Sequence, residues 1–291
     1  MNLFEPDLAS VVNLMPQKDE IGQLLGTTAY WTASVRAMES KRDDRLISDQ
    51  WAEILAGDVG AEWIKQRTAD AVLPIVLRTR YFDDFLQRIA YQSGIRQVVL
   101  MAAGLDTRAF RLSWPESTRI FELDQPEVMQ YKNQILSTDT AKPNCERHVI
   151  AVDLTGHWLD RLTDAGLDLR QPSAWLLEGF LFYLPEELIT RLLAEIALSA
   201  SGASWLGFDV INSFMLTSPY TRSWIEMQAK AGAPWIGTLD DPIGFLNQYG
   251  WQGTMTQAGQ MDANYGRWTL PVLPTMMPEF PHNWFVTACK R

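Results

Sequence analysis

The chain has 291 residues, of which 47% are hydrophobic and 21% charged, and this composition supplies enough apolar surface for one large globular domain. A formal net charge of -10 excludes nucleic acid as a partner, because phosphates are bound by clustered lysines and arginines. Two cysteines are too few for a disulfide framework, and the first residues lack the pattern of a signal peptide, so we expect a cytoplasmic protein. No apolar run is long enough to span a membrane, so we expect no membrane partner.

Two amphipathic segments precede the first predicted strand. Apolar residues recur every three to four positions over residues 20–41 and again over residues 72–91, which predicts two helices. Gly94 ends the second helix. We therefore expect an N-terminal helical part over residues 1–95.

Short apolar runs rich in β-branched residues alternate with helical patterns along the rest of the chain. We predict strands over residues 97–102, 119–123, 148–152, 174–177, 204–210 and 284–288, with helices over residues 126–136, 158–165 and 185–198 between them. This alternation predicts an α/β, doubly wound, mostly parallel sheet with helices on both faces. We expect residues 1–291 to fold as one domain.

The later part of the chain departs from this alternation. Residues 211–265 are more numerous than a plain crossover needs, and they mix Trp224 and Trp235 with turn residues. We predict a substrate cover in this stretch, a cofactor-binding core over residues 96–210 and C-terminal strands over residues 266–291.

The turns after the first two predicted strands carry features of a nucleotide site. Ligands of open α/β sheets bind beyond the carboxyl ends of the strands. The small residues from Ala102 to Gly104 let a ligand approach the backbone, although an ordinary strand-to-helix turn has the same look. Asp124 stands twenty positions after Gly104, the separation at which a carboxylate accepts the hydroxyls of a ribose, and its alternative role is to cap the next helix.

The third and fourth predicted strands are also followed by acids. Asp153 can accept a hydrogen bond from an adenine amino group while Leu154 packs on the ring, and helix capping is again the alternative. Glu178 is expected to be half-buried, so it needs a cationic partner such as the amino group of a ligand. Three acids at three successive strand ends predict a site for a nucleotide-like cofactor.

The pattern of small residues selects among such cofactors. A nicotinamide or flavin enzyme needs G-x-G-x-x-G around the pyrophosphate, and the turn from Ala102 to Gly104 does not supply it. S-adenosyl-L-methionine has no phosphate, but its amino-acid part needs an anion for the amine and a cation for the carboxylate. Glu178 and one of Arg78 or Arg80 can fill these roles, which predicts S-adenosylmethionine as the cofactor.

Residues 98–112, VVLMAAGLDTRAFRL, resemble the first motif of the leucine carboxyl methyltransferase superfamily. Further blocks resemble successive motifs of that family in the same order: RTRYFDD at 78–84, FELDQP at 121–126, DL at 153–154 and WLLEGFLFYLP at 175–185. Residues 28–31 and 264–268 resemble its bacterial branch, which contains polyketide-tailoring enzymes such as the tetracenomycin O-methyltransferase. The resemblance covers most of the chain.

The resemblance implies a class I methyltransferase fold, Rossmann-like, with a seven-stranded sheet, N-terminal helices and a helical cover. It implies that Asp124 holds the ribose and that Asp153 and Leu154 hold the adenine. The other predicted cofactor contacts surround the methionine part and the adjoining turns: Arg78, Arg80, Ala102, Gly104, Asp106, Gln125, Glu178 and Gly179.

One position departs from the pattern of that family. The family usually has glycine where this chain has Ala102, so a methyl group lies where the cofactor passes closest to the backbone. This departure predicts a weaker affinity for the cofactor or a shifted cofactor.

Methyl transfer from a sulfonium is an in-line displacement, so the protein mainly aligns the reacting atoms and excludes water. A carboxylate acceptor needs only a cationic or tyrosyl anchor, whereas a hydroxyl needs a base, and none of the three histidines stands out as one. We predict that Tyr183, Arg222 and Tyr265 position the substrate, and that no metal takes part.

These observations predict an O-methyltransferase that modifies a carboxyl or hydroxyl oxygen of a small molecule, in secondary metabolism. A protein carboxyl methyltransferase and a non-catalytic cofactor-binding module are the alternatives. A nicotinamide oxidoreductase is disfavoured by the missing glycines. The acceptor is the expected partner, and the sequence leaves a homodimer open.

Overall fold

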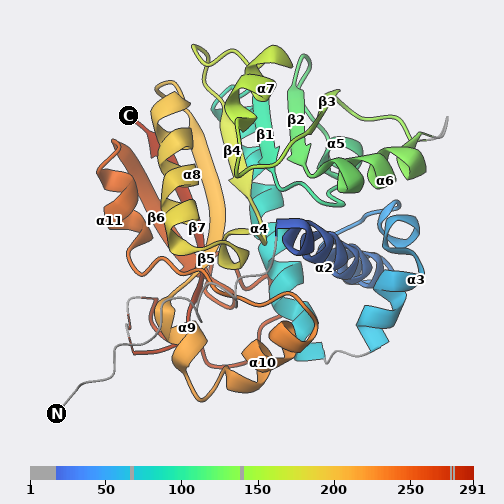
Figure 1. The fold of residues 1–291 in the computed structure, drawn as a ribbon, viewed down its shortest axis with the longest axis vertical. Coiled ribbons are helices and arrows are strands. Elements are labelled where there is room, and N and C mark those ends of the chain that lie inside the picture. The colour runs from blue at the N-terminus through green and yellow to red at the C-terminus, as the bar shows by residue number, and fades with distance from the viewer. Residues whose placement is uncertain (1–17, 66–68, 138–140, 276, 278) are drawn as a thin grey trace.

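Seven strands form one sheet at the centre of the structure (Figure 1). The computed structural model describes residues 18–65, 69–137, 141–275, 277 and 279–291. Within these residues the strands are β1 (Gln97–Met101), β2 (Arg119–Asp124), β3 (Glu146–Ala151), β4 (Ala174–Leu177), β5 (Trp205–Ile211), β6 (Trp251–Gln257) and β7 (Asn283–Lys290). Their order is β3-β2-β1-β4-β5-β7-β6, and β7 alone runs against its neighbours. The predicted doubly wound, mostly parallel sheet is confirmed.

The helices cover both faces of this sheet. Those described are α2 (Lys18–Ser40), α3 (Ala52–Lys65), α4 (Ala69–Gln92), α5 (Arg108–Arg111), α6 (Pro126–Leu136), α7 (Trp158–Asp164), α8 (Glu186–Ser199), α9 (Ser213–Thr217), α10 (Arg222–Lys230), α11 (Pro242–Asn247) and a 3₁₀ turn, η1 (Leu181–Tyr183). Residues 1–17 of the predicted N-terminal part lie outside the described residues.

Alternate side chains of β1 enter two different cores. Val98 and Leu100 pack with α4, α5 and α6, whereas Val99 and Met101 pack with α7 and α8. All five residues of β1 are therefore buried, which is why this strand is a continuous apolar run in the sequence. The register pairs Met101 with Leu123 in β2 and with Leu177 in β4, so the turns after these three strands begin at one edge of the sheet.

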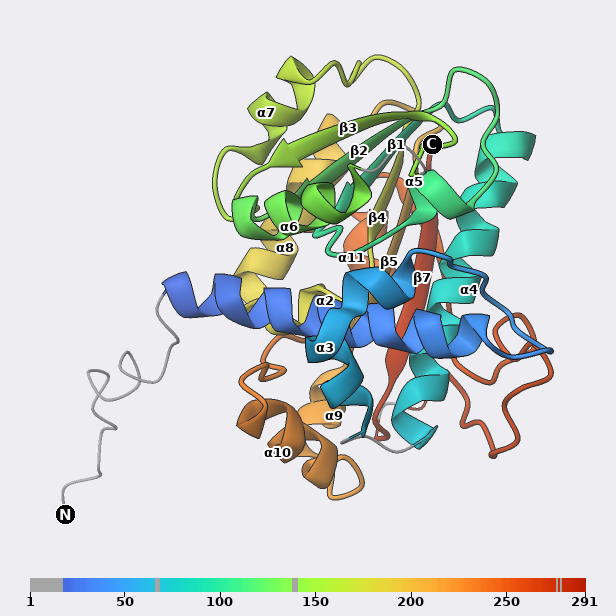
Figure 2. The same cartoon turned by 90° about the vertical axis from the view of Figure 1, so that its right-hand side faces the viewer.

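The sequence analysis misses one helix in the N-terminal part. Helix α3 is interrupted at Gly57, whose φ of 54° is not helical, and this break hides its periodicity. Helix α3 packs against α2, and Figure 2 shows both crossing the molecule beside the sheet. Together they form one wall of the region beyond the strand ends.

The predicted cover and C-terminal strands need correction. After residue 266 only one strand, β7, is described, and its partner β6 lies at residues 251–257, inside the predicted cover. The residues of β6 are mostly polar and only three of the seven are buried, in keeping with its place at the edge of the sheet, so no apolar run marks it. Helix α11 packs against β6 as part of the sheet layers, and only α9 and α10 lie beyond the strand ends (Figure 1).

No helix in the described ranges combines the length and the apolar character that crossing a membrane requires.

Candidate active site

A cavity of about 590 Å³ lies beyond the carboxyl ends of β1, β2 and β4. Its walls come from α2 and α4, from the turns after β1 to β4, from η1, and from the segment that carries α9 and α10. The volume is in the range of sites that hold small ligands and cofactors. The structure thus places a cavity at the edge of the sheet where the sequence predicts a cofactor.

Asp124 is the last residue of β2, and its carboxylate fixes the turn after β1. One oxygen accepts the backbone N–H of Gly104 at 2.6 Å and the other accepts the N–H of Gln125 at 2.7 Å. Burial raises the pKa of Asp124, and these two backbone donors partly offset that effect. Gln125, not Asp124, occupies the N-cap position of α6, so the helix-capping alternative does not describe this residue. Both oxygens keep lone pairs for hydroxyl groups in the cavity.

The turn after β1 contains two residues in the left-handed region. Gly104 has φ of 48°, which glycine adopts without cost, and Ala102 has φ of 50°, which costs an L-residue roughly 1 kcal/mol. Both line the cavity. The position where the family usually has glycine is therefore one where the backbone itself favours glycine.

Asp153 and Leu154 follow β3 and line the same cavity. One oxygen of Asp153 accepts two hydrogen bonds from Thr155, one from its backbone N–H at 2.8 Å and one from its side-chain hydroxyl at 2.7 Å. These bonds hold the carboxylate in a tight turn. The N-cap of α7 is His157, so Asp153 does not cap that helix. Leu154 is buried and offers an apolar surface next to the turn.

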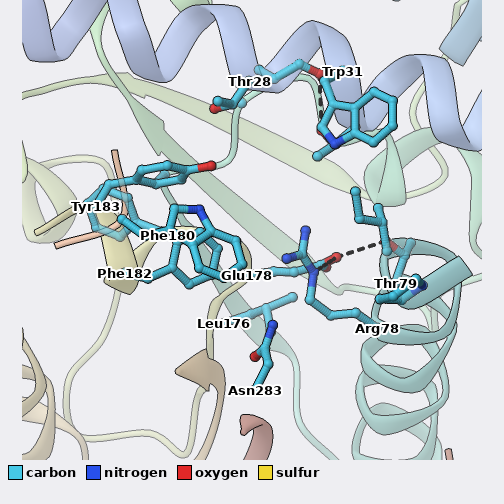
Figure 3. A pocket seen from close by; sticks show the side chains of 18 of the residues that line it. Thr28, Trp31, Arg78, Thr79, Leu176, Glu178, Phe180, Phe182, Tyr183 and Asn283 are labelled. Carbon is cyan, nitrogen blue, oxygen red and sulfur yellow. Dashed lines mark hydrogen bonds and ion pairs between the residues drawn. The ribbon is translucent and has the colours of Figure 1, made fainter. Parts of the chain in front are cut away.

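Glu178, directly after β4, is already paired by residues of the chain. It accepts from Arg78 Nε at 3.1 Å, from the Thr79 hydroxyl at 2.8 Å and from Arg108 Nη2 at 2.6 Å. Burial by itself would raise the pKa of Glu178, but Arg108 and Arg78 together lower it to about 2. Figure 3 shows Arg78 and Thr79 turned toward Glu178. The sequence predicts that Glu178 binds the amine of the ligand and that Arg78 binds its carboxylate. The structure instead pairs these two side chains with each other.

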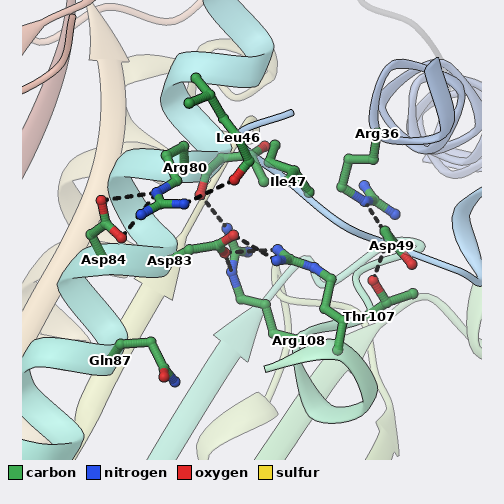
Figure 4. Close-up of polar contacts among 12 residues, drawn as sticks. Arg36, Leu46, Ile47, Asp49, Arg80, Asp83, Asp84, Gln87, Thr107 and Arg108 are labelled. Carbon is green, nitrogen blue, oxygen red and sulfur yellow. Dashed lines mark hydrogen bonds and ion pairs between the residues drawn. The ribbon is translucent and has the colours of Figure 1, made fainter. Parts of the chain in front are cut away.

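Four members of this ion cluster are not among the site residues predicted from the sequence: Asp83, Arg108, Arg111 and Asp209. Arg108 also bonds Asp83 at 2.7 Å (Figure 4). It pairs with Asp106 as well. Asp209, fully buried in β5, accepts the Gly179 N–H at 2.6 Å and Arg78 Nη1 at 3.0 Å. The signal for Asp209 was present, because an acid within the apolar run WLGFDVI must have a partner.

The resulting network holds one more carboxylate than guanidinium groups. Its ion pairs join three arginines to four acids: Arg78, Arg108, Arg111, Asp83, Asp106, Glu178 and Asp209. Gly179 belongs to the same network through its backbone, and its φ of 70° brings it so close to Arg78 that an added Cβ would lie 2.7 Å from Nη2. This net negative charge suits a cationic ligand.

Three predicted site residues do not line the cavity. Arg80 follows Arg78 by two positions, which turns its side chain to another side of α4, where it bonds Asp84 and the Leu46 carbonyl (Figure 4). The hydroxyl of Tyr265 bonds the same Asp84 at 3.0 Å. Arg222 is exposed at the start of α10. The structure therefore places Arg80, Tyr265 and Arg222 outside the lining of this cavity.

Tyr183 does line the cavity. Burial raises the pKa of Tyr183, and contacts with Trp235 and Thr28 together with the positive charge of Arg78 act in the opposite direction. Its ring centroid lies 4.8 Å from that of Phe182, and Figure 3 shows both rings on one wall of the cavity.

His282 is the one histidine among the described lining residues. Its Nδ1 lies 2.7 Å from Gln257 Oε1 and its Nε2 lies 2.8 Å from the Met277 carbonyl. Both ring nitrogens are therefore engaged by the chain.

The fold and the cavity define the class of protein: a class I methyltransferase, with the acids at the ends of β2, β3 and β4 around one cavity. The chain belongs to the leucine carboxyl methyltransferase family, whose model matches residues 29–197.

Relatives and solved structures agree with this family assignment. A Streptomyces coelicolor protein to which S-adenosylmethionine-dependent methyl transfer is ascribed is 37% identical, over 82% of this chain and 87% of its own. A Saccharopolyspora erythraea protein with the same ascribed activity is 38% identical, over 84% and 88%. The crystal structure of a Thermobifida fusca protein to which methyltransferase activity is ascribed shares the fold, with a TM-score of 0.59, 15% identity and coverage of 89% and 94%. The protein is an S-adenosylmethionine-dependent methyltransferase.

Proposed function

We propose that the protein methylates a carboxyl or hydroxyl oxygen of a small molecule, with a place in secondary metabolism. The observation that carries this proposal is the wall of the cavity opposite the ion network, which is formed by aromatic and amide side chains. An ammonium acceptor would need a carboxylate on that wall, and none of the described residues provides one there.

The residues around the cavity fit S-adenosylmethionine. Asp124 would bind the ribose hydroxyls with the lone pairs that the backbone donors leave, and Asp153 with Leu154 would bind the adenine. The methionine part would lie on the ion network through Glu178 and Arg78. That network carries one negative charge in excess, and a sulfonium with an amine and a carboxylate carries one positive charge.

When bound, S-adenosylmethionine supplies a methyl group on a sulfonium sulfur: the acceptor oxygen gains the methyl, the electron pair of the C–S bond stays on sulfur, and a hydroxyl acceptor releases its proton to solvent. The chain contributes orientation and exclusion of water. Helix α10 and Trp235 would cover the acceptor, and the Tyr183 hydroxyl would offer it a hydrogen bond. No side chain has to change its covalent state.

The test is a calorimetric titration with S-adenosylmethionine and S-adenosylhomocysteine, with NADH as a control, followed by a screen of small acids and phenols using labelled methyl groups. We expect micromolar binding of the first two ligands, no binding of NADH, and transfer of label to oxygen. Tight cofactor binding with transfer to nitrogen, or to a protein carboxyl group alone, would contradict the proposal.

A further inference from the structure

Asp209 is the most deeply buried acid of the ion network. Its side chain has no exposed surface, whereas that of Glu178 is 12% exposed. Its neighbours in β5, Phe208 and Val210, pack into the core beneath α8, so the alternation of the strand turns Asp209 to the face covered by α4. Arg78 reaches it from that helix.

Each oxygen of Asp209 meets one donor. Oδ1 accepts the N–H of Gly179 at 2.6 Å and Oδ2 accepts Arg78 Nη1 at 3.0 Å, while Glu178 accepts Nε of the same guanidinium at 3.1 Å. Arg78 is thus held between two carboxylates. Burial raises the pKa of Asp209, and Arg78 and the Gly179 N–H act in the opposite direction. Because both oxygens accept from donors, these bonds fit the ionised carboxylate.

Negative charge prevails on the side of the cavity formed by the turns after β1 to β4. Among the described residues that line the cavity, three arginines stand against four acids: Arg36, Arg78, Arg108, Asp106, Asp124, Asp153 and Glu178. Arg36 is already paired with Asp49 at 2.9 Å. Asp209 adds a further negative charge directly behind Arg78, outside the lining itself.

Methyl transfer changes the charge of the ligand that lies on this side. S-adenosylmethionine carries a sulfonium, an ammonium and a carboxylate, hence one net positive charge. When the methyl group leaves, the electron pair of the C–S bond stays on sulfur, and S-adenosylhomocysteine has no net charge. A buried anionic wall therefore attracts the substrate form of the cofactor more strongly than the product form, because charges screen each other weakly away from water.

We propose that Asp209 is a positioning residue that makes the site prefer the sulfonium cofactor over its thioether product. It fixes Arg78 against the turn after β4, and it supplies the negative charge by which the network exceeds its guanidinium groups. This inference rests on the proposed placement of the methionine part on the ion network, and it adds a means of releasing the product.

Three ligands test the proposal by calorimetry at pH 7: S-adenosylmethionine, S-adenosylhomocysteine and sinefungin, which carries an amine in place of the methylated sulfonium. Asp209→Asn keeps the shape and an oxygen for the Gly179 N–H, but removes the charge beside Arg78. We expect the affinity for S-adenosylmethionine relative to S-adenosylhomocysteine to fall at least about threefold, with sinefungin following S-adenosylmethionine. Asp58→Asn, an exposed site in α3, is the matched control and should leave this ratio unchanged. Equal losses for all three ligands, or no binding of any of them, would overturn the proposal.

Arg111→Gln shifts the charge in the opposite direction. Arg111 lies outside the cavity lining and pairs with Asp83, which keeps its bond to Arg108 at 2.7 Å. Loss of this guanidinium makes the network more negative, so the preference for S-adenosylmethionine over S-adenosylhomocysteine is expected to rise about twofold. A purely structural role would not move the two variants in opposite directions. A ratio that falls or stays constant in Arg111→Gln would refute the charge argument, and this variant decides the question if circular dichroism shows that Asp209→Asn does not fold.

The proposed function is measured separately, by transfer of labelled methyl from S-adenosylmethionine. Transfer to oxygen with a constant binding ratio in both variants would defeat the inference about Asp209 and leave oxygen methylation intact. Transfer only to nitrogen, with ratios that shift in opposite directions, would defeat the proposed function and support the inference.

Discussion

The half of the cavity that we propose for the cofactor is held together by buried ion pairs, whereas the half that we propose for the acceptor is lined by aromatic rings. The ion pairs fix their partners in one geometry, because separating them leaves an uncompensated buried charge. The rings impose shape and exclude water, and they tolerate different substituents. Under the proposed function, one half would hold the cofactor and the other would select the acceptor.

Breaking the ion network should have the largest effect. Glu178→Gln is expected to lower the free energy of unfolding by about 3 kcal/mol at pH 7, since the pKa of Glu178 is held at about 2 in the folded state, against 4.5 ordinarily. For a lowered pKa the stabilisation is complete above about 4.5 and is lost as the pH falls toward about 2. Urea unfolding at several pH values measures it.

The exposed Glu187 of α8 supplies the matched control, and Glu187→Gln should change little at any pH. A loss for Glu178→Gln that stays constant from pH 7 to pH 3 would show that its charge is not what stabilises the fold.

Removing the carboxylate of Asp124 should act on cofactor binding. Asp124→Ala is expected to weaken binding of S-adenosylmethionine by about 2 kcal/mol, because the ribose hydroxyls and two backbone donors lose their acceptor. Calorimetry measures the affinity, with Asp58→Ala, an exposed site in α3, as control. Unchanged affinity would remove Asp124 from the cofactor site.

Truncating the aromatic wall should affect only the acceptor half. Trp224→Ala is expected to weaken binding of an aromatic acceptor by about 1.5 kcal/mol and to leave the affinity for S-adenosylhomocysteine unchanged. Dialysis and calorimetry on the same preparation measure both. A parallel loss of both affinities would mean that the two halves are not independent.

A substitution at Ala102 tests whether backbone strain in the turn after β1 affects stability and cofactor binding. Ala102→Gly is expected to stabilise the fold by about 0.5 kcal/mol, because the relief of a positive φ exceeds the entropy that glycine adds to the unfolded chain, and to tighten cofactor binding. Thermal unfolding measures the first effect. Ala103→Gly, one residue on and outside the positive-φ region, should destabilise instead; shifts of the same sign for both variants would reject the strain argument.

The smallest effect is expected for residues outside the cavity. Arg80→Gln removes a half-exposed ion pair with Asp84, so cofactor affinity should stay within about 0.3 kcal/mol of the unmodified protein. A larger loss measured by calorimetry would return Arg80 to the site.

The ends of β1, β2 and β4 were predictable because these strands are buried on both faces and are visible as apolar runs, with Asp124 and Glu178 at the ends of β2 and β4. Strand β3, which precedes Asp153, lies at the edge of the sheet and is only partly buried. Strand β6 was not predictable, because the sequence of a mostly polar edge strand resembles that of a loop. Choosing between Arg78 and Arg80 requires the rotation of α4 relative to the sheet, which tertiary packing sets.

The partners of Glu178 were also beyond the sequence. Arg78 lies 100 positions before it and Arg108 lies 70 before it, so the pairing exists only once α4 and the turn after β1 have packed beside β4. Likewise, nothing near Asn283 in the chain indicates that β7 begins at the floor of the cavity.

Strand β7 runs against its neighbours, so it starts at the edge where the parallel strands end. A residue at its start, such as Asn283, lines the cavity without belonging to any of the turns after β1 to β4. The connection from β6 to β7 can then change in length and composition while the turns after β1 to β4 stay intact. Because β7 is reversed, the segment that leads into the proposed acceptor side can vary independently of the turns proposed for the cofactor. An engineer could exchange this segment to obtain a different acceptor.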